Sequence, residues 1–240
     1  MRNYQSIVDD WRSSELMNEI ELDKRLREFR ILFAYHSGRL ECDGVTYSDT
    51  RELFERGTVS DFTGEVRPLV AQLCVKRCDA MLARCAISRE PLTVELAQRV
   101  HGALTAGALD NSYYTEGDEE YGAFKKSDGV RGSSALKVEM DLGELFDEIN
   151  SYCGEETMIA AAYLHARFEY IFPFADGNGR VGRALLNYYL ITHGHPPLVI
   201  FISERELYLD CLARYDEDEE LDPLVELLKY ETVRTWEGRV

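Results

Sequence analysis

The sequence predicts an all-α protein, because apolar residues recur at three- and four-residue spacing along most of its 240 residues and strands are hard to place. Only six prolines interrupt the chain, and it contains neither an internal repeat nor a low-complexity tract. An apolar share of 45%, with 11% aromatic residues, is typical of a packed globular protein. A chain of this length is enough for one full core or for one domain with an appended lobe.

The spacing places nine helices along the chain. The first carries an apolar stripe from Leu22 to Leu40, and the second is expected to begin at an N-cap, Ser48, and to stop at Gly57. In the third, Cys74 and Cys78 lie four residues apart, which suits small hydrophobic side chains on one helix face. The expected ranges are 20–41, 48–57, 65–86, 93–106, 141–152, 155–171, 179–193, 204–215 and 221–236.

The charge and the cysteines exclude several classes of protein. The 27 Lys and Arg residues against 44 Asp and Glu residues leave a net charge of −17, which argues against general binding to nucleic acid or to an anionic membrane. Six cysteines without a C-x-x-C pair make a zinc site a poor interpretation. No run approaches the roughly 20 apolar residues of a membrane span, and Asp9 and Asp10 follow a start without a signal-peptide core. We therefore expect a reduced, cytoplasmic protein.

Residues 107–135 differ from the rest of the chain, because they lack strong helical periodicity. This stretch contains five glycines, clustered acids at 118–120 and a short basic segment, Phe124-Lys125-Lys126. A stretch of this length is typical of a functional flap, a binding loop or a mobile segment. It is also where the sequence leaves room for a short β-hairpin, although a plain glycine-rich loop is an alternative.

Residues 172–183 carry the strongest sign of chemistry. Pro173 should end the preceding helix near Ile171, and Asp176-Gly177-Asn178-Gly179 then forms a tight turn before the next helix. Such a turn directs backbone N–H groups and the positive end of the helix dipole at one point, as phosphate sites do.

Three side chains around this turn add to the phosphate interpretation. Arg180 and Arg183 share a helix face, so both can meet one anion, and Asp176 is an oxygen ligand of the kind that Mg²⁺ accepts. The pattern predicts a magnesium-nucleotide site. A solvated surface turn is the alternative.

The segment Phe172-Pro-Phe-Ala-Asp-Gly-Asn-Gly-Arg-Val-Gly-Arg183 resembles the signature of the Fic (Fic/Doc) family, His-Pro-Phe-x-Asp/Glu-Gly-Asn-Gly-Arg-x-x-Arg, at every defining position except the first. The resemblance extends over most of the chain. It implies a helical Fic fold with a hairpin flap near 121–132, in a core at 61–240 that follows N-terminal helices at 1–60. The activity that it implies is transfer of AMP from ATP to a Ser, Thr or Tyr hydroxyl of a protein.

By the same resemblance, Asp176 would bind Mg²⁺, while Gly177, Asn178, Gly179 and Arg180 would hold the phosphates. Arg183 would meet the γ-phosphate of ATP. The flap would align the target by main-chain pairing through Phe124, Lys125 and Lys126, and the lysines would also attract the nucleotide.

The first motif position departs from the family. Phe172 stands where the family has its catalytic His, and a phenyl ring cannot accept a proton from the attacking hydroxyl. We therefore expect activity to be severely reduced or absent. His165 lies seven residues earlier, and His193 and His195 lie beyond the next helix, so none of them is an obvious replacement.

A second resemblance concerns regulation. Many Fic proteins carry an inhibitory helix, Ser/Thr-x-x-x-Glu-Gly/Asn, whose Glu pairs with the second Arg of the motif. Ser37 and Glu41 resemble that element and face the same way on a helix, although Cys42 replaces the usual Gly. The alternative is an ordinary exposed Glu at a helix end.

Three functions therefore remain open. The first is a self-inhibited AMP transferase impaired by Phe172, and the second is a nucleotide-binding or partner-binding protein without the chemistry. The third is an AMP-removing hydrolase, which Phe172 weakens as well. The target protein and the choice of nucleotide cannot be read from the residues, and a homodimer through the terminal helices stays open.

Overall fold

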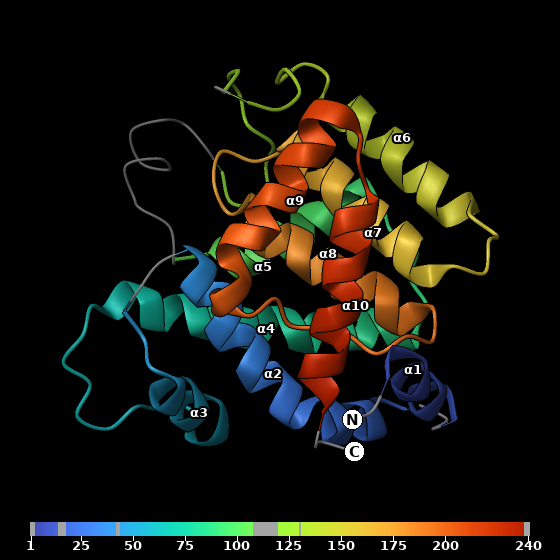
Figure 1. The fold of residues 1–240 in the computed structure, drawn as a ribbon. Helices are drawn as coiled ribbons and strands as arrows, with labels where there is room; N and C mark the ends of the chain where they lie inside the picture. The colour runs from blue at the N-terminus through green and yellow to red at the C-terminus, as the bar shows by residue number, and fades with distance from the viewer. Residues whose placement is uncertain (1–2, 14–17, 42–43, 108–119, 130, 238–240) are drawn as a thin grey trace.

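The structure, a computed structural model, describes residues 3–13, 18–41, 44–107, 120–129 and 131–237, and their regular secondary structure is helical throughout (Figure 1). Each of the nine expected helices is present, with ends that differ from the expected ones by at most three residues. The α-helices are α1 (Tyr4–Ser13), α2 (Glu19–Glu41), α3 (Tyr47–Arg56), α4 (Val66–Ile87), α5 (Val94–Thr105), α6 (Val138–Ser151), α7 (Thr157–Ile171), α8 (Asn178–Thr192), α9 (Arg205–Asp218) and α10 (Asp222–Trp236), and a 3-10 turn, η2 (Ile202–Glu204), precedes α9.

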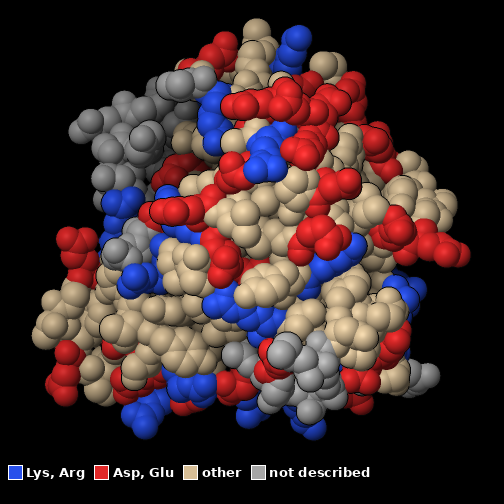
Figure 2. Space-filling view, viewed as in Figure 1, with Lys and Arg blue, Asp and Glu red and all other residues tan. Residues whose placement is uncertain are grey.

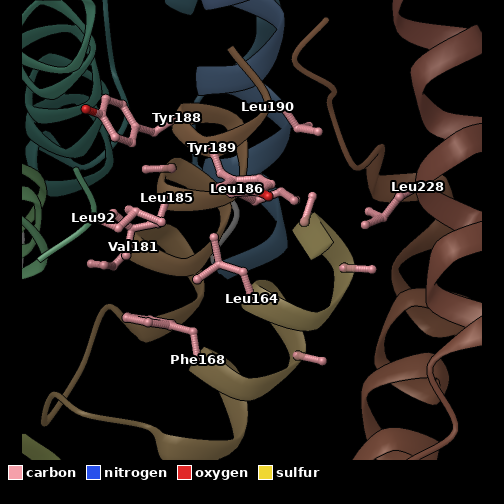
Figure 3. Close-up of a cluster of buried hydrophobic side chains, with 14 of the residues drawn as sticks. Leu92, Leu164, Phe168, Val181, Leu185, Leu186, Tyr188, Tyr189, Leu190 and Leu228 are labelled. Atoms are coloured by element: carbon pink, nitrogen blue, oxygen red, sulfur yellow. The ribbon is translucent and has the colours of Figure 1, made fainter. Parts of the chain in front are cut away.

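Helix α8 lies at the centre of the fold, in contact with α2, α4, α5 and α7 (Figure 1). Its side chains are buried along almost the whole helix, because apolar residues occur on all of its faces. Figure 3 shows part of this core, in which Leu164 and Phe168 of α7 meet Val181 and Leu185 of α8. The residues that follow the 172–178 loop are therefore held rigidly from several sides.

Helix α1 was not expected from the sequence, since its ten residues carry only one short apolar face. That face packs against α2 and α10, where Trp11 lies 5.3 Å from Trp236 between ring centroids. The Arg25 guanidinium lies 4.0 Å from the Trp11 ring centroid. The first turns of the chain thereby close a second, smaller core around α2.

The start of α3 differs from the expectation. Thr46 is the N-cap in place of Ser48, and it forms a capping box in which its side chain accepts from the Asp49 N–H while Asp49 accepts from the Thr46 N–H. Only a residue three positions before Asp49 can make this exchange, which Ser48 cannot. Gly57 ends the helix with a φ of 79°, as expected.

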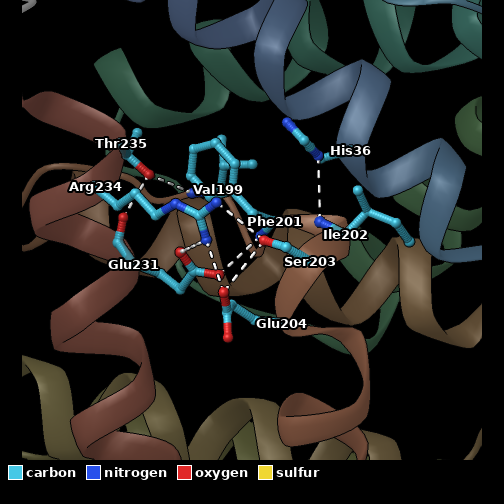
Figure 4. Close-up of polar contacts among 9 residues, drawn as sticks. All are labelled: His36, Val199, Phe201, Ile202, Ser203, Glu204, Glu231, Arg234 and Thr235. Atoms are coloured by element: carbon cyan, nitrogen blue, oxygen red, sulfur yellow. Dashed lines mark hydrogen bonds and ion pairs between the residues drawn. The ribbon is translucent and has the colours of Figure 1, made fainter.

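A polar network links α2, the segment 199–204 that contains η2, and α10 (Figure 4). The Ile202 N–H donates to His36 of α2, and the Phe201 N–H donates to Glu231 of α10. Arg234 joins α10 to η2 through Glu204 at 3.0 Å. Since His36 directly precedes Ser37, this network helps to position the end of α2 that was assigned to inhibition.

Cys74, Cys78 and Cys85 are buried free thiols on α4, so the prediction of small hydrophobic side chains is confirmed. Cys42 lies outside the described residues. The ranges described hold no group of three or more His, Cys, Asp or Glu residues that could bind a metal. Among those same ranges no helix is long and apolar enough to cross a membrane.

Acidic side chains gather at the end of α9, where residues 216–220 are all exposed Asp and Glu (Figure 2). Basic side chains lie in small groups over the face shown, some of them beside these acids. The end of α9 is therefore a concentrated acidic area on this face.

The expected β-hairpin flap is wrong for the described part of residues 121–132, which forms turns and bends. Gly122 and Gly132 have φ values of 88° and 90°, which interrupt an extended chain. Instead of pairing with itself, the segment bonds to the loop after α7. The Lys125 N–H donates to the Pro173 carbonyl and the Ser133 N–H to the Ile171 carbonyl, each at 3.0 Å.

Candidate functional site

The loop between α7 and α8 begins at Phe172. Helix α7 ends at Ile171, as expected from Pro173, and the Phe172 N–H closes the last turn on the Phe168 carbonyl at 3.1 Å. Phe172 leaves the right-handed α region for the left-handed one, with a φ of 50°, whereas a residue before proline usually becomes extended. This conformation costs about 1 kcal/mol or more for a residue with a side chain, so the surrounding contacts must hold it.

Asn178 uses its side chain to shape the loop. Its Oδ1 accepts from the Phe174 N–H at 2.9 Å and its Nδ2 donates to the Phe174 carbonyl at 2.8 Å. Gly177, with a φ of 82°, starts α8 without a side-chain cap on the helix N-terminus. The first backbone N–H groups of α8 are therefore left for a ligand, while the Asn178 amide is occupied in holding the turn.

Arg183 is 3% exposed and is held by α2. Its Nε donates to the Ser37 hydroxyl at 3.0 Å, and its Nη2 donates to the Ser37 carbonyl at 3.1 Å and to Glu41 Oε1 at 2.6 Å. Gly179 makes this approach possible, because a Cβ at that position would lie 2.6 Å from Glu41 Oε1. The second arginine of the motif is thus paired with a carboxylate from a distant helix.

The electrostatics favour the ionised form of Glu41. Burial would raise the pKa of this carboxyl, but Arg183, with Arg180 and Arg205 beside it, holds the pKa below its usual value. Both arginines of the motif therefore stabilise the same negative charge, as expected for an anion-binding site. Arg180 is itself 8% exposed.

A pocket of about 180 Å³ opens beside this pair. Its walls come from the ends of α2 and α7, the first half of α9, the first two turns of α8, the loop before α8 and Arg131. Asp176 and Phe172 lie on its wall together with Glu169, whose buried carboxyl has a pKa raised to about 7 by burial. The lining residues are Leu40, Glu41, Arg131, Glu169, Phe172, Asp176, Gly177, Asn178, Gly179, Arg183, Arg205, Tyr208, Leu209 and Leu212.

Asp176 is the one carboxylate that the motif loop presents to this pocket among the described residues. Its Oδ1 accepts from the Gly177 N–H, which leaves Oδ2 for another partner. Mg²⁺ is commonly bound by one or two carboxylates together with phosphate oxygens and waters. One carboxylate of this kind fits a magnesium ion whose other ligands are nucleotide phosphates and waters. It is not enough to bind the ion without a nucleotide.

His101 of α5 joins the motif loop to the 120–129 segment, and the sequence did not point to it. Its Nε2 donates to the Asp176 carbonyl at 3.1 Å, and its Nδ1 accepts from the Gly122 N–H at 3.0 Å. The ring stacks on Phe174 with centroids 3.9 Å apart. Burial lowers the pKa of His101 to about 4, so the imidazole is neutral and uses each nitrogen for one bond. No signal in the sequence links residues this far apart.

Phe172 is flanked by cations from the segment that was expected to be a flap. The Arg131 guanidinium lies 4.6 Å from the centroid of its ring and Lys125 Nζ lies 6.0 Å away. Phe124 packs against Phe174 with a centroid distance of 5.4 Å. Lys126 is exposed.

The remaining histidines considered from the sequence lie away from Phe172 in buried or capping positions. His165 Nε2 lies 2.8 Å from the Tyr208 hydroxyl, and burial lowers its pKa to about 3. His193 stacks on Tyr189 at the end of α8, and His195 contacts Tyr4 of α1 at 2.7 Å.

Comparison with known proteins gives one family and a consistent set of relatives. Residues 91–190 match the Fic/DOC family. The chain is 27% identical over 234 residues to "Protein adenylyltransferase Fic" of Aedes aegypti, an alignment that covers 93% of this chain and 44% of that protein. The chain therefore spans less than half the length of this relative.

Among solved structures, the fold is similar to a Fic domain containing signaling protein of Bacteroides thetaiotaomicron, with a TM-score of 0.82 and 23% identity over 98% of this chain and 94% of that one. It is also similar to Fic-1 (residues 134–508) of Caenorhabditis elegans, with a TM-score of 0.79 and 21% identity over 98% of this chain and 68% of that one.

Proposed function

The chain carries a Fic/DOC family domain at residues 91–190, and from this premise we propose that it is a nucleotide-binding protein of the AMP-transferase type. In this proposal Glu41 blocks the site against the γ-phosphate of ATP, and Phe172 leaves the transfer step without its proton acceptor. The acceptor of AMP would be a Ser, Thr or Tyr hydroxyl of a protein target.

The contact between Arg183 and Glu41 is the observation that carries the proposal. A buried guanidinium that donates to a carboxylate at 2.6 Å uses the same N–H groups that a phosphate would take. Ser37 accepts from Nε and Nη2 of Arg183 as well, so an incoming γ-phosphate would compete with the end of α2 for these donors. Removing Glu41 should therefore free the anion site.

Phe172 sets the expected rate. General-base help from a correctly placed residue is worth about 10²–10⁴-fold, and neither His165 nor His193 contacts the loop where it would be needed. We expect transfer by this chain to be slower by that factor than transfer by a variant with His at position 172. AMP removal would be weakened in the same way.

The protein groups around the reacting phosphate would act by position and charge. Asp176 would hold Mg²⁺ together with the phosphates, and the ion would supply charge neutralisation for the phosphate oxygens. Gly177 and Gly179 leave the α8 backbone accessible, and Arg180 adds a positive charge beside the first turn. These groups bind and orient the nucleotide without needing a proton transfer.

A second candidate function is a regulatory module that binds nucleotide without transferring it. Phe172 favours it, because Arg131 lies against the ring and stabilises an aromatic residue at this position. This candidate predicts nucleotide binding that Glu41 regulates and no transfer even when His is restored.

The test compares four proteins: the chain, Glu41→Gly, Phe172→His and the double variant. Labelled-AMP transfer to the protein itself and to mixed protein substrates measures chemistry, and calorimetric ATP titration with Mg²⁺ measures binding. We expect tighter ATP binding in both Glu41→Gly variants and transfer chiefly in the double variant.

A matched control is Glu144→Gln, which removes an exposed carboxylate from α6 far from Arg183 in the sequence and should leave ATP affinity unchanged. Glu41→Gln keeps the length of the side chain and removes its negative charge. It therefore separates the loss of the ion pair with Arg183 from the effect of a glycine on the end of α2. If the double variant binds ATP and remains inactive, the regulatory module replaces the transferase. If ATP affinity does not respond to Glu41, the inhibitory role is wrong.

A further inference from the structure

Lys125 carries a buried ammonium group for which the described residues supply no hydrogen-bond acceptor. The residue is 6% exposed, and Nζ is buried without a hydrogen-bond partner among the described residues. Withdrawing an ammonium group from water without a partner is costly. A buried cation of this kind is expected where an anion completes the site.

The backbone holds Lys125 in place beside Phe172. The Lys125 N–H donates to the Pro173 carbonyl on one side of Phe172, and the Ser133 N–H donates to the Ile171 carbonyl on the other. Gly132 fits closely between them, since a Cβ there would lie 2.6 Å from Phe172 Cβ and 3.1 Å from Lys125 Nζ. The ammonium group is therefore shielded from water by its neighbours in this structure.

A second cation lies next to the first. The Arg131 guanidinium rests over the Phe172 ring at 4.6 Å, and its repulsion adds to burial in lowering the pKa of Lys125. Asp128 opposes this effect by its charge, but its Oδ1 accepts from the Ala135 N–H and does not bond Lys125. Arg131 is exposed and its Nη2 donates to the Glu169 carbonyl at 3.0 Å, so its other N–H groups are left to meet a ligand from solvent.

Arg131 and Phe172 line the pocket at the start of α8 together with Gly177 and Arg183. Lys125 does not line it, but its Nζ lies 6.0 Å from the centroid of the Phe172 ring. We propose that Lys125 and Arg131 form an anion-binding site over the ring of Phe172, which takes a phosphate group of the nucleotide bound in that pocket. This inference rests on the proposed function and specifies which residues bind a phosphate at the position where the family has its proton acceptor. Arg183, held by Glu41, would bind a different phosphate.

The experiment measures calorimetric affinities for ADP, adenosine and pyrophosphate in buffer free of phosphate and sulfate. ADP is chosen because it does not need the γ-phosphate position that Glu41 blocks. Lys125→Met keeps the apolar stem and removes the charge, and Lys137→Met removes an exposed charge from the same connection as a matched control. Arg131→Gln tests the second cation.

We expect Lys125→Met to weaken ADP and pyrophosphate binding about 10- to 100-fold, as for loss of a hydrogen bond to a charged group. Adenosine affinity should not change, and Lys137→Met should differ from the unmodified chain by less than about twofold. The ligand-free Tm of Lys125→Met should be equal or higher, because the variant no longer buries an ammonium group without a hydrogen-bond acceptor. A lower Tm would show that Lys125 serves the fold and would overturn the anion site.

The outcomes separate this inference from the proposed function. If ADP binds Lys125→Met as tightly as the unmodified chain, the anion site is refuted and nucleotide binding stands. If pyrophosphate binds in a Lys125-dependent way while ADP and ATP do not bind at all, the cation pair stands and the nucleotide function fails. If ADP, ATP and pyrophosphate all fail to bind, both the anion site and the proposed function fail.

Discussion

Glu169→Gln should remove a large pH dependence from the stability of this protein. Glu169 is 5% exposed on α7, and Oε1 has no hydrogen-bond partner among the described residues. Burial raises the pKa of its carboxyl from 4.5 to about 7, against the opposing charge of Arg183. At about 1.4 kcal/mol per pH unit, this change corresponds to about 3 kcal/mol of folding free energy.

The direction follows from proton binding. Between pH 4.5 and about 7 the folded state keeps the Glu169 proton while the unfolded state has lost it. Stability from this group is therefore complete below the unfolded pKa and is lost as the pH rises through the folded pKa. Glutamine cannot ionise, so the variant gains on the unmodified chain by up to about 3 kcal/mol as the pH rises from 4 to 8.

Denaturant unfolding at half-unit steps from pH 4 to 8.5 measures this difference. Other groups that titrate in the same range, such as Glu231 with a pKa raised to about 7 by burial, are common to both proteins and cancel in the difference. Glu144→Gln, at an exposed position on α6, is the matched control and should give a flat difference. A flat difference for Glu169→Gln as well would refute the argument from burial.

Three further changes test packing around the same helices. Gly182→Ala should destabilise the fold by about 1–3 kcal/mol in denaturant unfolding, because a Cβ would lie 2.7 Å from a carboxylate oxygen of α7. The control is Gly143→Ala on α6, where an added Cβ has no atom within 4 Å, and it should stabilise the fold by about 0.5–1 kcal/mol. Equal effects of the two substitutions would contradict the packing argument. His101→Phe should keep the ring stack but speed amide hydrogen exchange at Gly122, since its acceptor is lost, and unchanged exchange there would show that the bond is dispensable. Asn178→Ala should cost about 1–3 kcal/mol by leaving two buried loop groups unpaired, and a cost below about 0.5 kcal/mol in the same unfolding assay would mean that water replaces the amide.

Most of the helices could be predicted because the signals that define them are local. The apolar spacing of 20–41 and 221–236 and the stop at Gly57 depend on neighbours within one or two turns. Helix α1 was not predicted, because its stability comes from the contact of Trp11 with Trp236 at the other end of the chain. The predicted hairpin was wrong because the Lys125 and Ser133 N–H groups donate to the carbonyls of Pro173 and Ile171, and not across a hairpin.

The candidate site also has features that depend on local sequence and features that depend on tertiary packing. The turn from Asp176 to Gly179, the end of α7 before Pro173 and the absence of a histidine at position 172 follow from residue types and short-range sterics, so the sequence alone was sufficient for them. Which groups surround that turn depends on how remote helices pack. The neutral His101 between two backbone groups depends on the tertiary structure, because burial and hydrogen-bond partners are set by residues distant in sequence. The same holds for the buried ammonium of Lys125, for which the described residues supply no hydrogen-bond acceptor.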